Sequence, residues 1–160
     1  MQPNARKTAV RPKPRLSHLA EDGSARMVNV GDKPVQQRRA VATGRLVCAP
    51  ATLRALRQQA LPKGDVLAVA NIAGVQAVKQ ASHLIPLCHP LPIEHVELQF
   101  EVEASAIEIT CTVATDAKTG VEMEALTGVS VAALTLYDMC KAVDKTMRIE
   151  GIHVVEKVKR

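Results

Sequence analysis

The sequence GVEMEALTGVSVAALTLYDMCKAVDK, residues 120–145, decides the fold of this chain. Most of it is expected to form one helix, because Ala, Leu, Met, Val and Cys cover nearly its whole circumference. A helix that is apolar all round must be buried in a sizeable core or in an oligomer interface. The polar groups inside it therefore need a physical reason.

Several of these polar groups fall on one stripe of the expected helix. At about 100° per residue, the stripe holds Glu124, Thr127, Asp138, Lys141 and Lys145. Asp138 and Lys141 are neighbours one turn apart, so an acid and a base are expected to share one buried edge. A structural ion pair would explain them. The alternative is catalytic, since burial and a close partner move pKa values towards proton exchange near neutral pH.

Length and composition predict one globular domain with an aliphatic core. The chain has 160 residues, of which 47% are hydrophobic and 1% aromatic. Stacking on aromatic rings, which many single-strand nucleic-acid binders use, is therefore essentially absent. No apolar run approaches the roughly 18 residues that span a bilayer, and four scattered cysteines with no C-x-x-C pair indicate reduced thiols and a cytoplasmic location.

The net charge of +5 belongs to the N-terminus. Five of the 21 basic residues precede the first acidic residue, so the other 16 balance the 16 acidic ones. Residues 1–15 are expected to be a disordered basic tail, and residues 16–160 a single domain. A neutral body argues against a nucleic-acid-binding surface, although a binder that uses only the tail is a separate hypothesis.

The remaining periodicities predict strands interleaved with two long helices and a shorter one. The alternation at 96–103 and 107–113 indicates an antiparallel hairpin that turns near Ala104 and Ser105. Asp65 can cap the helix that follows it. The expected elements are strands 25–30, 38–48, 96–103, 107–113 and 149–158, with helices 49–60 and 65–84 beside the long one. This order implies an α+β two-layer sandwich.

Three other short segments carry candidate chemistry. Lys63 precedes a helix N-terminus and could hold a phosphate, or be an ordinary solvated lysine. Cys88 and His89 stand in a proline-rich loop, where hydrogen-bonded structure is the plain reading and metal binding a minor one. If residues 118–124 are extended, Glu122 and Glu124 point the same way and offer two carboxylates, or they are two solvated glutamates.

Four of these segments resemble the signatures of the MoaC family. They are Lys63-Gly-Asp-Val66, Leu84-Ile-Pro-Leu-Cys-His-Pro-Leu91, Lys118-Thr-Gly-Val-Glu-Met-Glu-Ala-Leu-Thr127 and Leu136-Tyr-Asp-Met-Cys-Lys-Ala142. The resemblance runs in order from about Leu16 to Val158. It implies a ferredoxin-like α+β sandwich, assembled as a homohexamer, a trimer of dimers, with active sites at subunit interfaces.

The resemblance also implies the reaction of molybdenum cofactor biosynthesis in which 3′,8-cyclo-7,8-dihydro-GTP becomes cyclic pyranopterin monophosphate and diphosphate. The enzyme would be a lyase that needs no cofactor or metal and takes its substrate from a radical SAM GTP cyclase. The resemblance implies catalytic roles for Asp138, Lys141 and Lys63. It gives substrate-binding positions to Leu87, Cys88, His89, Glu122, Met123, Glu124, Lys79 and Lys157.

One position departs from the family pattern. Asn29 stands where relatives usually carry Asp, in the segment Met27-Val-Asn-Val30, so the group there is neutral in this chain. With the Ala-rich helices, this departure keeps a second hypothesis open, a non-catalytic nucleotide-binding or scaffolding hexamer. Turnover, as distinct from binding, separates the two.

Overall fold

The computed structural model describes residues 20, 22–61 and 63–160. The predicted basic tail and the predicted domain start at residue 16 lie outside them. The elements, in chain order, are β1 (Gln36–Val47), α1 (Pro50–Arg57), α2 (Val66–Lys79), α3 (Ala81–Leu84), β2 (His95–Val102), β3 (Ala106–Ala117), α4 (Glu122–Cys140) and β4 (Arg148–Lys159).

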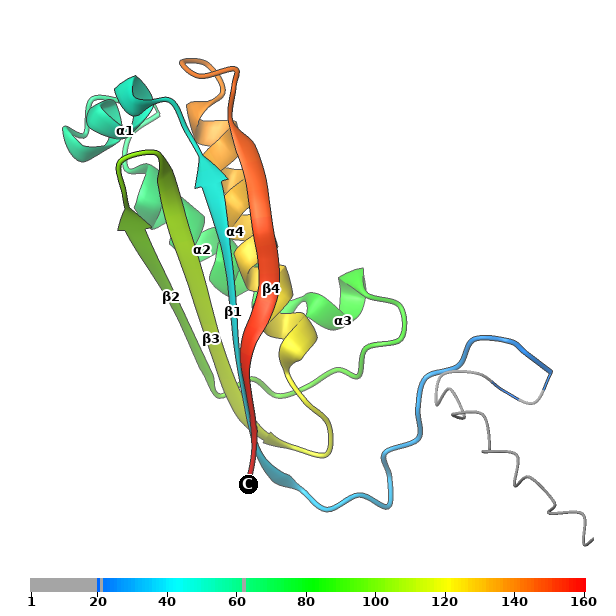
Figure 1. Ribbon diagram of the computed structural model, residues 1–160. Coiled ribbons are helices and arrows are strands. Elements are labelled where there is room, and N and C mark those ends of the chain that lie inside the picture. Colours follow the sequence, from blue (N-terminus) through cyan, green and yellow to red (C-terminus); the bar gives the residue numbers. More distant parts are fainter. Residues whose placement is uncertain (1–19, 21, 62) are drawn as a thin grey trace, which may run out of the picture.

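The four strands form one antiparallel sheet in the order β2-β3-β1-β4. Figure 1 shows α2 and α4 lying side by side across one face of this sheet. The strand order and the alternation of strands with crossover helices are those of a ferredoxin-like α+β sandwich, so the predicted fold is confirmed. The hairpin between β2 and β3 turns at the predicted place.

The core lies between α4 and the two central strands. Alternate residues of β1 and β3 face the helices and are buried, among them Leu46, Ile107 and Ile109. On α4, Val129 and Leu136 are fully buried against them. Alanines fill the remaining space, and the predicted aliphatic, Ala-rich core is confirmed.

Two glycines let α2 lie very close to α4. A Cβ added to Gly74 of α2 would be 3.2 Å from the carbonyl oxygen of Gly128 on α4. A Cβ on Gly128 would be 2.7 Å from Cys111 Sγ and 2.8 Å from Val78 Cγ2, closer than carbon atoms can pack. The two helices are therefore held as one layer, and α4 has a fixed position on the sheet.

The predicted helix 65–84 is two helices. Asp65 caps α2, as expected, by accepting a hydrogen bond from the N–H of Ala68 at 3.0 Å. Gln80 leaves helical geometry at φ −108° and ψ 8°, and its N–H bonds to Ala77 three residues back. The chain then turns and buries Ala81, and this change of direction leads into the loop 85–94.

The predicted strand 25–30 is wrong. Only Ala25 forms a β-bridge, and residues 26–30 are irregular. In residues 26–31, the backbone carbonyls of Val28 and Gly31 accept hydrogen bonds from the side chains of distant loops and not from a neighbouring strand.

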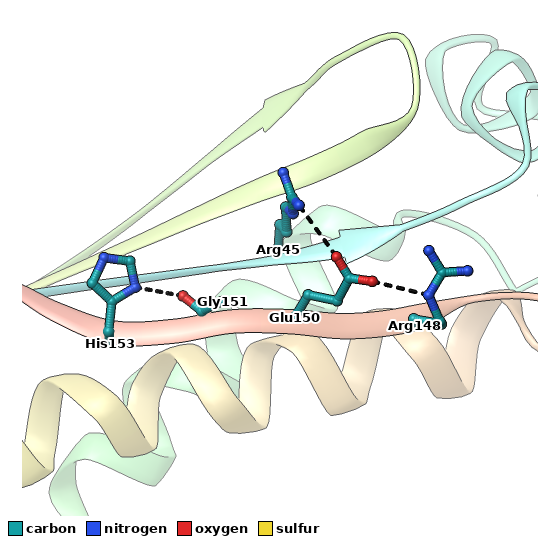
Figure 2. Close-up of polar contacts among 5 residues, drawn as sticks. All are labelled: Arg45, Arg148, Glu150, Gly151 and His153. Carbon is teal, nitrogen blue, oxygen red and sulfur yellow. Dashed lines mark hydrogen bonds and ion pairs between the residues drawn. The ribbon is translucent and has the colours of Figure 1, made fainter.

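The other face of the sheet is polar and carries ion pairs. Arg45 Nη2 lies 3.2 Å from Glu150 Oε2, and Arg148 Nε lies 2.9 Å from Glu150 Oε1. The side chains of these ion pairs point away from α4 (Figure 2). Nearby, His153 Nδ1 donates to the carbonyl of Gly151 at 2.6 Å. Gly151 has φ +65°, and β4 shifts register twice against β1 in this region.

Candidate functional site

The candidate residues gather at the two ends of α4. We call the residues at its start the pocket group and those at its end the lysine group. The pocket group is Leu87, Cys88, His89, Glu122, Met123, Glu124 and Lys157, and the lysine group is Lys63, Asp138 and Lys141.

Six members of the pocket group line a cavity of about 410 Å³, and the seventh, Lys157, forms an ion pair with one of them, Glu122. The loop 85–94 supplies Leu87, Cys88 and His89, and the first turn of α4 supplies Glu122, Met123 and Glu124. Six more residues line the cavity that were not among the candidate residues. Leu91, Thr119 and Gly120 lie within the quoted motif segments, so the motifs could have pointed to them. Val28, Val30 and Lys33 lie outside those four segments, and no periodicity placed them at a site.

Glu124 is the buried acid of the pocket, with 4% of its surface exposed. Burial raises the pKa of its carboxyl, its own backbone N–H lowers that pKa in part, and neighbouring Glu122 raises it again. Burial, and then Glu124, also raise the pKa of the Cys88 thiol. Cys88 is therefore held as a neutral thiol beside the acid and is not activated as a nucleophile.

Glu122 and Glu124 do not point the same way. The condition of an extended entry is not met here, because Glu122 is already the first residue of α4. Two residues along a helix differ by about 200° in direction, so Glu122 turns towards β4 and forms an ion pair with Lys157. The Glu122 carboxylate occupies the space where a side chain at position 120 would stand, so a larger residue there would have to displace that carboxylate from its ion pair with Lys157.

The segment 28–33 lies against the pocket and is tied to both loops that build it. His89 Nε2 donates to the carbonyl of Val28 at 2.8 Å, and Lys118 Nζ donates to the carbonyl of Gly31 at 2.5 Å. Asn29 Oδ1 accepts the N–H of Gly31 at 2.8 Å, which is an Asx turn. An Asp oxygen can accept the same bond, so the turn is preserved in spite of the Asn29 departure.

In the lysine group, both lysines converge on Asp138. Lys141 Nζ lies 2.6 Å from Asp138 Oδ1, and Lys63 Nζ lies 3.0 Å from Asp138 Oδ2. Lys63 also donates to the backbone carbonyl of Asp138 at 3.0 Å. Two cations thus stand at the negative C-terminal end of the α4 dipole.

The predicted burial of this pair is wrong for the single chain. The side chains of Asp138 and Lys141 are 55% and 54% exposed. The helical wheel correctly predicted that the two side chains lie on the same side of the helix. At the last turn of α4, however, that side of the helix faces solvent. Hydrogen bonds from Lys141 and then Lys63 lower the pKa of Asp138, and Asp138 raises the pKa of Lys141. Both residues keep their charges at neutral pH, contrary to the expectation that their pKa values approach neutrality.

The two groups are far apart in one chain. Fourteen residues of helix separate Glu124 from Asp138, which at 1.5 Å per residue is about 21 Å. Lys79, the remaining predicted residue, is exposed at the end of α2 and lines neither the cavity nor the lysine group. The cavity and the lysine group of one chain therefore lie near opposite ends of α4.

Within residues 20, 22–61 and 63–160, no three His, Cys, Asp or Glu side chains converge as metal ligands would. In the same part of the chain, every helix is too short or too polar to cross a membrane.

Comparison with known proteins places this arrangement in a family. The MoaC family model matches residues 27–159. A cyclic pyranopterin monophosphate synthase of Chloroflexus aggregans is 56% identical over 144 residues, which cover 89% of this chain and 87% of that protein. One of Streptomyces griseus is 50% identical over 155 residues, 97% of this chain and 88% of that protein.

A third relative is longer. It is a molybdenum cofactor biosynthesis bifunctional protein of Chlorobaculum tepidum, 55% identical over 142 residues, which are 89% of this chain but 46% of that protein.

Proposed function

The chain belongs to the MoaC family, and from this we propose that it is a lyase of molybdenum cofactor biosynthesis, a cyclic pyranopterin monophosphate synthase. Its substrate is 3′,8-cyclo-7,8-dihydro-GTP, received from a radical SAM GTP cyclase in the cytoplasm. Its products are cyclic pyranopterin monophosphate and diphosphate.

One observation of the structure carries the proposal. Of the eleven residues to which the resemblance gives a role, ten fall into the pocket group or the lysine group at the ends of α4, although they come from five separate parts of the chain. The fold thus brings together residues that the core does not need. The proposed reaction needs this mixture, because the substrate carries several negative charges and its rings are rebuilt through proton transfers.

The charge states suggest a division of roles. Asp138 is ionised and is the proposed base, while Lys141 is protonated and is the proposed acid. Lys63 either donates a proton or binds phosphate. In the pocket, the raised pKa of Glu124 and the neutral Cys88 thiol suit hydrogen bonds to ring nitrogen and oxygen atoms. The ring system is therefore proposed to lie beside Glu124.

The active site is proposed to form between subunits of a homohexamer, a trimer of dimers. The separation of about 21 Å along α4 supports this, because a site that needs both groups must take them from two chains. Each chain would then give its pocket group to one site and its lysine group to another.

The test is an assay of purified protein on 3′,8-cyclo-7,8-dihydro-GTP that follows diphosphate and pterin together. We expect turnover by the wild type and loss of at least 100-fold, on the order expected for a positioned acid or base, in Asp138→Asn. Glu101→Gln is the control, since it makes the same carboxylate-to-amide change at an exposed position on β2 and belongs to neither group.

Two results would contradict the proposal. The catalytic role fails if Asp138→Asn keeps full conversion. If a folded wild-type hexamer binds the substrate without converting it, the scaffolding hypothesis replaces the enzyme.

A further inference from the structure

Lys33 lines the cavity, although no motif pointed to it. It belongs to the segment Val28–Lys33, which we call the strap. Val28 and Val30 are half-buried and, with Lys33, form one side of the cavity. The strap precedes the first strand of the sheet, whereas the rest of the lining comes from the loop 85–94, the loop before α4 and the first turn of α4.

The strap is fixed at three points. His89 holds the carbonyl of Val28, and Lys118 holds the carbonyl of Gly31. A turn closed by the N–H of Lys33 on the carbonyl of Val30, at 3.1 Å, then sets the direction in which the chain leaves. The backbone of Lys33 is thereby placed at the cavity by contacts with both loops that form it.

The charges around the cavity leave a place for an anion beside Lys33. Among the lining residues that the structure describes, Lys33 is the one lysine or arginine, and it forms no ion pair with another described residue. Of the two acids, Glu122 is neutralised by Lys157, and burial favours the neutral form of Glu124. The positive charge of Lys33 is thus free to attract a ligand.

We infer that Lys33 is a further substrate-binding residue that contacts a phosphate oxygen, and that Lys118 and His89 are positioning residues that hold the strap. The phosphate class follows from the proposed function, on which this inference rests. An ammonium group on a partly enclosed surface binds phosphate oxygens through charge-assisted hydrogen bonds. Lys118 does not itself line the cavity, so its action on substrate passes through Gly31.

The first experiment compares the KM of Lys33→Met, Lys33→Arg and wild type for 3′,8-cyclo-7,8-dihydro-GTP. We expect KM to rise about tenfold in Lys33→Met, by a larger factor than kcat falls, as for one lost charged contact. Lys33→Arg should recover most of the loss. Lys159→Met removes the same charge at the exposed end of β4 and should leave KM unchanged.

The second experiment tests the tie to Lys118. Hydrogen exchange at the amides of Gly31 and Lys33 should become faster in Lys118→Met and return to the wild-type rate in Lys118→Arg. The KM of Lys118→Met should rise in parallel. Unchanged exchange in Lys118→Met would refute the positioning role.

The failure of this inference differs from that of the proposed function. If the wild type turns over and Lys33→Met has the wild-type KM, the inference is wrong and the function stands. If the wild type does not turn over, calorimetric titration with GTP decides. Weaker binding by Lys33→Met than by Lys159→Met supports the phosphate contact, and equal binding overturns it.

Discussion

If active sites form between chains, two inactive variants can restore each other's activity. Asp138→Asn damages the lysine group and leaves the pocket group intact, whereas Glu124→Gln does the reverse. In a mixed assembly, a fraction of the sites receives the pocket group from the first variant and the lysine group from the second. Those sites contain no substitution.

The expected recovery follows from the geometry. Because the two groups lie about 21 Å apart on α4, the proposed site takes them from two chains. With equal amounts of the two chains and random assembly, each half of a site is intact with a chance of one half, so about one quarter of the wild-type activity returns. A site built within one chain would recover nothing.

The assay uses chains with different affinity tags, expressed together and purified through both tags, so that every oligomer contains both. Diphosphate release per chain is compared with that of the wild type and of each variant alone. The control pairs Asp138→Asn with Lys141→Ala, which damages the same group twice and should stay inactive. Activity of the first mixture at the level of the separate variants would refute the intersubunit site, as would recovery in the control.

Three further predictions concern stability and can be checked by thermal or denaturant unfolding. Asp144→Ala should cost about 3 kcal/mol or more, because this buried carboxylate accepts four hydrogen bonds, two from Thr146 and one each from Thr52 and the N–H of Ala49. Burial raises the pKa of Asp144, but the four hydrogen bonds together lower it below its ordinary value. The contribution of Asp144 to the free energy of unfolding is therefore complete above about pH 4 and is lost as the pH falls through the lower folded pKa. The opposite sign holds for Glu124, because its raised pKa makes the native state less stable as the pH rises above about 4.3. Glu124→Gln should therefore raise the Tm at pH 8 and change it little at pH 4. An equal change in Tm at both pH values would refute the argument. Gly128→Val should destabilise by about 2 kcal/mol or more by forcing α4 away from Cys111 and Val78, and a variant as stable as the wild type would show that the helices are not held closely.

The helices and strands could largely be predicted because each has its own periodicity. The alternation in β2 and β3 and the apolar run of α4 depend on neighbouring residues alone. The strap could not be predicted in this way. Its backbone partners are the side chains of His89 and Lys118, which lie at least 60 residues away in the sequence.

The candidate site was predictable as a set of residues but not as a place. A helical wheel relates Asp138 to Lys141, yet it does not say whether the shared stripe meets the core or solvent. It also gives directions around the axis and ignores the distance along it. The separation of Glu124 from Asp138 follows only once both are known to belong to one unbroken helix.

The irregular course of β4 has a consequence for how these chains can associate. β4 and β2 are the two edges of the sheet, and an edge with a regular row of free N–H and C=O groups recruits further strands without limit. The two register shifts of β4 and the left-handed Gly151 interrupt that row, and Glu97 and Glu101 place negative charges on β2. We therefore expect edge pairing to be disfavoured, and we expect contacts between copies to use the helix ends or the sheet face, where a closed, finite assembly can form.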